Sequence, residues 1–184
     1  KPYTKGDKKS YDKDVLDRYN KGELTSADSI HFADSLKRTT LRLGRTVYGG
    51  GGIMPDISVP LDTMQYTKLH RELSAKSCII NTALKYVDGN RKKLKKTYKT
   101  FEDFRNSFEI NDNVISIVKK EAEKAKAEIA DSALVETLPT LKVQLKALIA
   151  RDLWDMKEYF QIYNPTLDIY RKGTEVIESE EYLF

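Results

Sequence analysis

The sequence has 184 residues, enough for one domain with a substantial core, or one domain with an appended piece, but too few for two full-size domains. Hydrophobic residues make up 40% of it and charged residues 33%, a profile typical of a folded globular chain. The excess of 32 Lys and Arg over 28 Asp and Glu leaves a formal charge of +4, too small to indicate nucleic acid or anionic lipid as a partner.

Cysteine and histidine are scarce. Cys78 is the only cysteine, so neither an intrachain disulfide nor a thiolate metal cluster can form. His31 and His70 are the only histidines, and neither lies in a metalloprotease pattern. We therefore expect no metal and no cofactor. No apolar run approaches the roughly 20 residues that a membrane span requires, and we expect no membrane span.

Before Asp62 the pattern predicts turns, one short helix and strands. Ser10 is the expected N-cap of a helix that carries Val15, Leu16 and Tyr19 and stops near Gly22. Residues 38–43 form an extended run, Gly44 interrupts it, and residues 45–48 resume it. This alternation predicts a hairpin or a strand pair.

After Asp62 the pattern is almost wholly helical. Asp62 or Thr63 is the expected cap of a helix that runs to a break at Asp88-Gly89. Its apolar face consists of Tyr66, Leu69, Leu73, Ile80, Leu84 and Val87. Thr100 with Asp103 resembles a capping box before Phe104.

Three further helices are expected. One starts near residues 111–113 and carries Val114, Val118, Ala122, Ala125 and Ile129. Pro139 fits the first turn of the longest helix, in which Leu138, Leu141, Leu145, Leu148, Leu153, Met156 and Phe160 recur as either a core face or a seam for a partner. Asn164 and Pro165 suit the start of a last helix that runs to about Glu178.

The predicted fold class is therefore mainly α. A short N-terminal hairpin or strand segment, residues 1–61, precedes an α-helical C-terminal domain, residues 62–184.

Four consecutive glycines, residues 49–52, stand out in a chain with nine glycines altogether. Glycine reaches positive φ without steric cost, so such a run indicates a tight reversal or a close backbone approach. The spacing fits neither a Walker loop nor a dinucleotide fingerprint. Because Met54 precedes Pro55, it is pushed to extended geometry, and Pro55-Asp56 begins a turn into Ile57. The stretch thus predicts strand, glycine turn, Pro-Asp and strand.

These residues resemble a known motif. The order Gly44-Arg45-Thr46-Val47, followed by glycines and then by Gly52-Ile53-Met54-Pro55-Asp56-Ile57, is similar to the closing motif of the core domain in C-terminal processing peptidases, also called tail-specific proteases. Tyr48 stands where that family usually has a polar residue, and the turn is about one glycine longer. Residues 145–164 resemble the helical C-terminal extension of Bacteroides-type members. The turn motif comprises Gly44, Arg45, Gly49, Gly50, Gly51, Gly52, Pro55 and Asp56.

The resemblance implies a serine endopeptidase of the bacterial envelope, expected in the periplasm, in which a lysine base activates a serine and a PDZ domain captures the substrate C-terminus. In that family both residues of the dyad precede the glycine motif. The 43 residues before Gly44 contain neither segment, and no PDZ sequence is present. We therefore expect no catalytic residue in this chain, which resembles the tail of such a protease and should be inactive alone. The implied partners are the catalytic core and PDZ domain, protein or peptide substrates, and a second copy in a homo-oligomer.

Other patterns suggest catalysis more weakly. Ser116 and Lys119 match Ser-x-x-Lys of penicillin-recognising enzymes, but the companion motifs are missing. Ser74 and Lys76 are two apart, so they do not face each other on a helix. Asp152 and Asp155 could pair for sugar chemistry, although the polar side of an amphipathic helix is the favoured interpretation.

A second class of function stays open. Residues 91–96 form a basic run that could contact phosphates, with Tyr98 and Phe101 available to stack on bases. A solvated helix with Leu94 inward is favoured, so we do not expect nucleic acid as a partner. The aromatic group Trp154, Tyr159, Phe160, Tyr163 and Tyr170 favours packing, with a peptide groove as the alternative. The alternative to a protease tail is an independent helical module that binds protein or nucleic acid.

Overall fold

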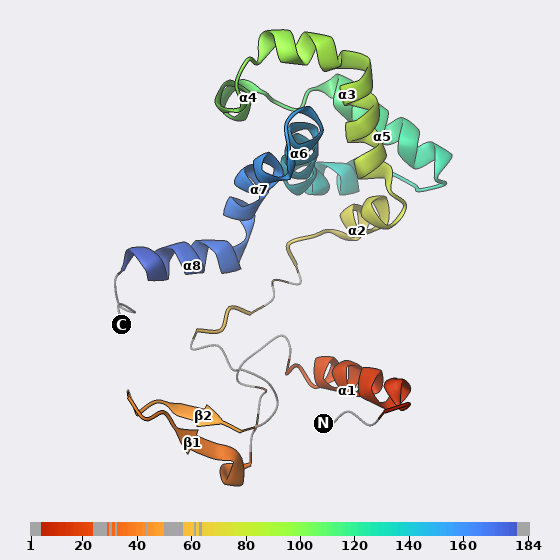
Figure 1. The fold of residues 1–184 in the computed structure, drawn as a ribbon. Helices are drawn as coiled ribbons and strands as arrows, with labels where there is room; N and C mark the ends of the chain where they lie inside the picture. Colours follow the sequence, from red (N-terminus) through yellow and green to blue (C-terminus); the bar gives the residue numbers. More distant parts are fainter. Residues whose placement is uncertain are drawn as a thin grey trace. The chain divides into compact units, whose positions relative to one another are not determined.

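The computed structural model describes residues 5–23, 29, 31, 33–42, 44–49, 57–60, 62 and 64–179. The chain forms two compact units, residues 1–62 and residues 63–184 (Figure 1). Over the described residues the fold is mainly α-helical with one short two-stranded hairpin, which confirms the predicted fold class.

The first unit begins with a helix, α1 (Lys8–Asn20). Asp7 is its N-cap, because its carboxylate accepts a hydrogen bond from the Ser10 N–H at 3.2 Å. The prediction that Ser10 is the cap was therefore wrong by one turn: Ser10 lies inside the helix, and a carboxylate upstream takes the role. Gly22, with φ +78°, follows the end of the helix as expected.

The hairpin pairs β1 (Lys37–Thr39), preceded by the 3-10 turn η2 (Asp34–Leu36), with β2 (Thr46–Tyr48). The strands are antiparallel, and Arg38 lies opposite Val47. Gly44 closes the turn with φ +63°, and its N–H bonds the Thr40 carbonyl at 3.1 Å. The predicted hairpin is confirmed, although its first strand ends before Thr40 rather than at residue 43.

The second unit is a helical bundle (Figure 1). In it α6 packs against α3 and α7, α3 also packs against α5, and α2 contacts α3 and α6. The elements are α2 (Lys68–Ala75), α3 (Cys78–Thr97), α4 (Phe101–Ser107), α5 (Asp112–Lys124), α6 (Asp131–Leu153), α7 (Met156–Tyr163), the 3-10 turn η3 (Asn164–Thr166) and α8 (Asp168–Glu178).

The core of this unit is built from apolar side chains at helical spacing. The largest fully buried ones include Phe104, Leu73, Ile79, Leu141, Leu145, Ile149 and Val87. Phe104 is the aromatic centre: it stacks on Phe108 with 4.5 Å between ring centroids and packs against Trp154 at 5.3 Å.

The helix expected from Asp62 or Thr63 to Gly89 is corrected by the structure. Asp62 is not helical, Thr63 lies outside the described residues, and the cap is Thr67, whose hydroxyl accepts from the His70 N–H at 3.1 Å. The interruption falls at Lys76 and Ser77, where Ser77 has φ +59°. Gly89 lies inside α3, because burial of residues on both sides of it holds the helix together.

The predicted capping box of α4 and the predicted start of α5 near residues 111–113 are confirmed. The Thr100 hydroxyl accepts from the Asp103 N–H at 3.1 Å, and the Asp103 carboxylate accepts from the Thr100 N–H at 3.3 Å, which completes a capping box. Asn111 caps α5 by accepting from the Val114 N–H. Ala125 and Ile129, predicted on that helix, follow its last residue.

The longest predicted helix divides in two. Pro139 is inside α6 rather than in its first turn. Proline has no N–H, so the carbonyl of Val135 lacks its helical hydrogen bond. Both residues are exposed, so water can bond this carbonyl instead. The helix ends at Leu153, and Asp155 caps α7 by accepting from the Met156 N–H at 2.6 Å.

The last predicted helix also begins later than expected. Asn164 and Pro165 form the 3-10 turn η3, and α8 starts at Asp168, while the predicted end at Glu178 is confirmed.

Candidate functional site

The most distinctive surface of the second unit belongs to α8. Ile169, Gly173, Val176 and Ile177 recur at the spacing that puts them on one face of a helix. None of the residues of α8 is buried; Ile169 is 67% exposed and Ile177 is 80% exposed. We call these four residues the apolar stripe of α8. An amphipathic helix whose apolar side faces solvent indicates an interaction surface.

Local chemistry explains why α8 is helical without a buried face. The Leu167 carbonyl accepts from the N–H groups of Tyr170 and Arg171, both at 3.1 Å, which starts the first turn. Arg171 forms an ion pair with Asp168, and Lys172 pairs with Glu175 at 2.7 Å. Pairs three residues apart support an exposed helix, and Asp168 suits the positive end of the helix dipole.

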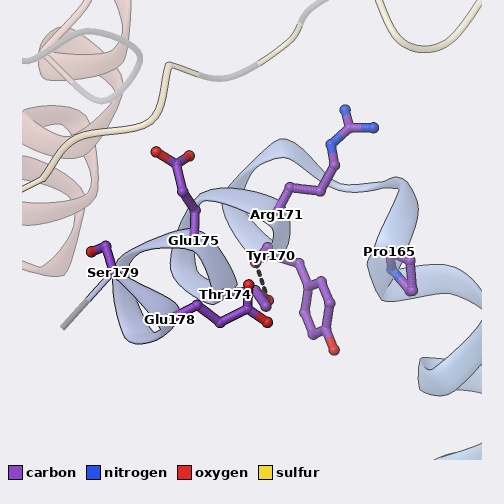
Figure 2. A pocket seen from close by; sticks show the side chains of 7 residues that line it. All are labelled: Pro165, Tyr170, Arg171, Thr174, Glu175, Glu178 and Ser179. Atoms are coloured by element: carbon purple, nitrogen blue, oxygen red, sulfur yellow. Dashed lines mark hydrogen bonds between the residues drawn. The ribbon is translucent and has the colours of Figure 1, made fainter.

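A shallow groove of about 540 Å³ lies against α8 (Figure 2). It is lined by Pro165, Tyr170, Arg171, Thr174, Glu175, Glu178 and Ser179. The Thr174 hydroxyl is satisfied within the helix, since it donates to the Tyr170 carbonyl at 3.0 Å. Among its described lining residues there is no histidine, cysteine or lysine. The groove therefore offers a phenol ring, a guanidinium and carboxylates to a bound chain, and no nucleophile with an adjacent base.

A cluster of aromatic side chains joins α7 to the residues before and within α2. The Tyr66 and Tyr163 hydroxyls hydrogen-bond each other, and the Tyr66 ring stacks on His70 with 4.7 Å between centroids. Tyr159 stacks on Tyr163 at 5.2 Å. Burial, followed by the hydrogen bond with Tyr66, raises the pKa of the Tyr163 phenol well above its usual range. The Tyr163 phenol therefore stays neutral at physiological pH, and its hydrogen bond with Tyr66 ties α7 to the residues before α2.

His70 is a core histidine. It is buried, and its Nε2 has no hydrogen-bond partner of good geometry. Desolvation lowers the pKa of the His70 imidazole, and the Gln144 side chain beside it opposes that shift only in part. In the part of the chain that the structure describes, no group of three or more His, Cys, Asp or Glu side chains could hold a metal ion.

Glu121 is a buried carboxylate of α5 that forms ion pairs with two exposed lysines. Its carboxylate accepts from Lys85 of α3 at 2.6 Å and from Lys124 of α5 at 2.9 Å. These hydrogen bonds, that from Lys85 first, lower the pKa of the Glu121 carboxyl. Burial raises the pKa of the nearby Cys78 thiol, and the charge of Glu121 adds to that effect, so this cysteine is a poor nucleophile.

The candidate nucleophile Ser116 is engaged elsewhere. The Ser116 hydroxyl donates to the Asn113 carbonyl at 2.7 Å, and Lys119 lies 3.5 Å from the Asp131 carboxylate. Similarly, Lys76 bonds Glu72 and the Lys126 carbonyl, each at 2.8 Å, rather than Ser74. These contacts describe helix surface and helix ends, not a dyad.

The two aspartates near Trp154 have separate structural tasks. Asp152 pairs with Arg151 at 2.9 Å, and its other oxygen is buried without a partner. Asp155 is the N-cap of α7. They do not act as a matched acid and base.

The basic run on α3 presents its lysines to solvent and turns Leu94 inward, as the favoured interpretation expected. Arg91 reaches across to the Asp152 carbonyl at 2.7 Å, and Lys95 lies over the Trp154 ring at 5.9 Å. Part of its charge is therefore used to fasten α3 to the end of α6. Of the predicted aromatic group, Phe160 and Tyr170 remain exposed.

The turn motif is described only in part. The Arg45 N–H bonds the Thr40 hydroxyl at 3.0 Å, and the Gly49 N–H bonds the Leu36 carbonyl at 2.7 Å. Both contacts hold the two strands in register. Gly50, Gly51, Gly52, Pro55 and Asp56 lie outside the described residues.

The tyrosine-histidine cluster and the stripe of α8 were not among the sites expected from sequence. Tyr66 and His70 are four residues apart in sequence. This spacing predicts a contact only if the chain is helical there, and the helix start at Thr67 was not predicted. The stripe is visible as the spacing of residues 169, 173, 176 and 177. Whether a neighbour covers such a stripe depends on tertiary structure.

A family of unknown function (DUF8443) matches residues 69–155. The matched segment runs from α2 to the end of α6, so it covers most of the packed bundle and stops before α7 and α8. Neither a curated protein nor a solved structure shows significant similarity to the chain. Among the described residues, no helix has the length and apolar character to cross a membrane.

Proposed function

We propose that this chain is the non-catalytic C-terminal portion of a serine endopeptidase of the C-terminal processing type and is accessory to proteolysis. The observation that carries the proposal is the state of the hairpin in the first unit. Between residues 5 and 62, none of the side chains whose exposure the structure describes is buried, and the strands β1 and β2 pair over only three residues each.

An isolated two-stranded hairpin is at best marginally stable in water, and its outer edges expose unpaired N–H and C=O groups. In the proposal the missing strands belong to the protease core, whose sheet the hairpin completes. The segment Gly44-Arg45-Thr46-Val47, the first part of the motif that resembles the family, lies at the turn and second strand of this hairpin. The implied partners are therefore the catalytic core with its PDZ domain, in the bacterial periplasm.

The helical unit has an accessory role in this proposal. Its described candidate nucleophiles, Ser116 and Ser74, do not bond a lysine, whereas α8 presents an apolar stripe and a shallow groove. Contact with a protein or peptide is the chemistry that these surfaces suit.

The test compares peptide hydrolysis by this 184-residue chain with hydrolysis by the protein that includes the sequence preceding Lys1 in its gene. We expect only the longer protein to cleave, and to lose activity when the serine or the lysine of its dyad is replaced. Cleavage by this chain alone would overturn the proposal, and Ser116→Ala would then locate the nucleophile. Absence of cleavage by both proteins would also overturn it.

A second candidate is an independent helical interaction module, and the uncovered stripe of α8 favours it specifically. The second candidate is supported if neither protein cleaves peptides and the 184-residue chain still binds a partner through α8. Tight, steeply salt-dependent binding of nucleic acid would instead point to residues 91–96.

A further inference from the structure

The segment that joins the two units is fastened to the bundle through His70. The boundary between the units falls between residues 62 and 63, and Tyr66 lies between this boundary and α2. The Tyr66 ring stacks on His70 with 4.7 Å between centroids, and its hydroxyl bonds that of Tyr163 on α7. Tyr66 therefore connects a titratable side chain of α2 to a different helix of the bundle. We call these three residues the latch.

The site of the His70 ring suits its neutral form. The residue is 4% exposed, and its Nε2 is buried with no hydrogen-bond partner among the described residues. Burial disfavours a charged imidazole, and the Gln144 side chain, which favours one, has the smaller effect on the pKa. Histidine is also the side chain whose ordinary pKa, 6.5, lies close to physiological pH. Mild acid is therefore enough to charge this ring once it reaches water.

The charged groups around the latch do not compensate for a proton on the imidazole. On α2 itself, Arg71 donates to the Tyr66 carbonyl at 2.8 Å, and Glu72 is engaged in an ion pair of its own. From α6 the neutral amide of Gln144 faces the ring, and from α7 the neutral phenol of Tyr163 bonds Tyr66. No charge of a described residue, on these helices or on α3, contributes to the shift in pKa of the imidazole. A proton there would leave an uncompensated cation in the bundle.

Tyr66 is the part of this site that can move. Leu69 and Leu73 of α2 are buried in the core, so displacement of the helix would expose them. Tyr66 precedes the helix and is half-buried, so its ring can turn into water without breaking the core packing. We propose that the latch is proton-sensitive: uptake of a proton by His70 displaces Tyr66 from the imidazole and from Tyr163, and the segment before α2 separates from α7.

The rest of the bundle stays in place when the latch opens. Thr67, the N-cap of α2, is held separately, because its hydroxyl lies 2.6 Å from that of Thr137 on α6. The Gln65 amide donates to the Thr166 carbonyl at 3.4 Å, which is long for a hydrogen bond and therefore weak. Opening therefore stops at the cap of α2. Acid thus lengthens the free chain between the two units by the residues that precede Thr67.

Proton linkage sets the size of the effect. In the open form the imidazole has its ordinary pKa of 6.5, whereas the closed form resists the proton. The ratio of open to closed molecules then rises by up to about tenfold between pH 7.5 and pH 5.5, one unit on either side of that value. A rise of this size can be measured at a single residue.

Hydroxyl-radical labelling of the complete chain, read residue by residue with mass spectrometry, tests the latch. The oxidation rate of His70 reports how often its ring reaches water, and the exposed His31 corrects for the reactivity of a histidine at each pH. From pH 7.5 to pH 5.5 the ratio of His70 to His31 oxidation should rise severalfold, up to about tenfold. Phe104, which is fully buried in the same bundle, should stay unreactive at both pH values.

Variants separate the latch from a general effect of acid. Tyr66→Phe keeps the stacked ring but loses the bond to Tyr163, so His70 should oxidise faster already at pH 7.5. Its matched control is Tyr98→Phe, which removes a phenol hydroxyl at the end of α3 away from α2 and should leave His70 unchanged. His70→Gln cannot take up a proton, so oxidation of Tyr163 should rise at pH 5.5 in the unaltered chain and not in this variant.

Three results would overturn the proposal: an unchanged ratio of His70 to His31 oxidation, a parallel rise for Phe104, or a response of Tyr163 that persists in His70→Gln. A parallel rise for Phe104 would mean that acid opens the whole bundle rather than the latch. If His70→Gln fails to fold, equal oxidation of His70 in Tyr66→Phe and Tyr98→Phe would overturn the proposal as well. The peptidase assay is independent of this result, so either idea can fail without the other.

Discussion

Replacing Gly89 by alanine should stabilise the helical unit. Gly89 lies inside α3, its φ is not positive, and an added Cβ would meet no heavy atom within 4 Å. Alanine is therefore accommodated without strain, and it removes the backbone freedom that glycine gains on unfolding. The expected gain is about 1 kcal/mol, the difference between glycine and alanine in a helix interior. For a unit of about 120 residues this corresponds to a rise in Tm of about 4 °C.

The assay is thermal and urea unfolding of Gly89→Ala and the unaltered chain, followed by far-ultraviolet circular dichroism at the helical transition. The control is Lys92→Gly, which introduces a glycine at an exposed position of the same helix. It should lower the free energy of unfolding by about 1 kcal/mol. The sequence pattern placed a helix break at Asp88-Gly89, and a break would make the glycine a required cap. A loss of stability in Gly89→Ala would thus refute the continuous helix described above.

Three further predictions concern the same unit. Phe104→Ala, at a fully buried site, should lower the free energy of unfolding by about 3–5 kcal/mol, visible as a lower urea midpoint with an unchanged slope. Thr100→Ala should lower the free energy of unfolding by about 1 kcal/mol because it removes the cap of α4. Thr100→Ser keeps a capping hydroxyl and should lose much less in the same denaturation experiment. Because burial lowers the pKa of His70, the unfolded chain takes up its proton first, so stability should fall as pH drops below about 6.5. Urea midpoints between pH 8 and 5 should decline less for His70→Gln, and an unchanged decline would contradict this assignment.

Local chemistry explains the predictions that the structure confirms. The capping box at Thr100 and Asp103 and the start of α5 near residue 111 each depend on residues within one helical turn, so both can be recognised in a short stretch of sequence. The hairpin was predictable for the same reason, since its turn glycine and its strands are close in sequence.

The errors arise where distant residues decide the outcome. Thr67 is preferred to Asp62 as a cap partly because its hydroxyl also lies 2.6 Å from that of Thr137, 70 residues away. Pro139 is tolerated inside α6 because it and Val135, whose carbonyl it leaves unbonded, are exposed residues, and their exposure depends on how the whole bundle packs. The spacing of the α8 stripe was visible in sequence, but its exposure depends on which other helices reach it.

The position of Trp154 determines which part of the molecule tryptophan fluorescence can follow. It is the only tryptophan in the chain, and its indole packs edge-on against Phe101 with 5.9 Å between ring centroids. Tryptophan fluorescence, excited selectively over the eleven tyrosines, therefore reports how α4 leaves the end of α6. A fluorescence transition that precedes the loss of helical ellipticity would show that this junction opens before the bundle as a whole.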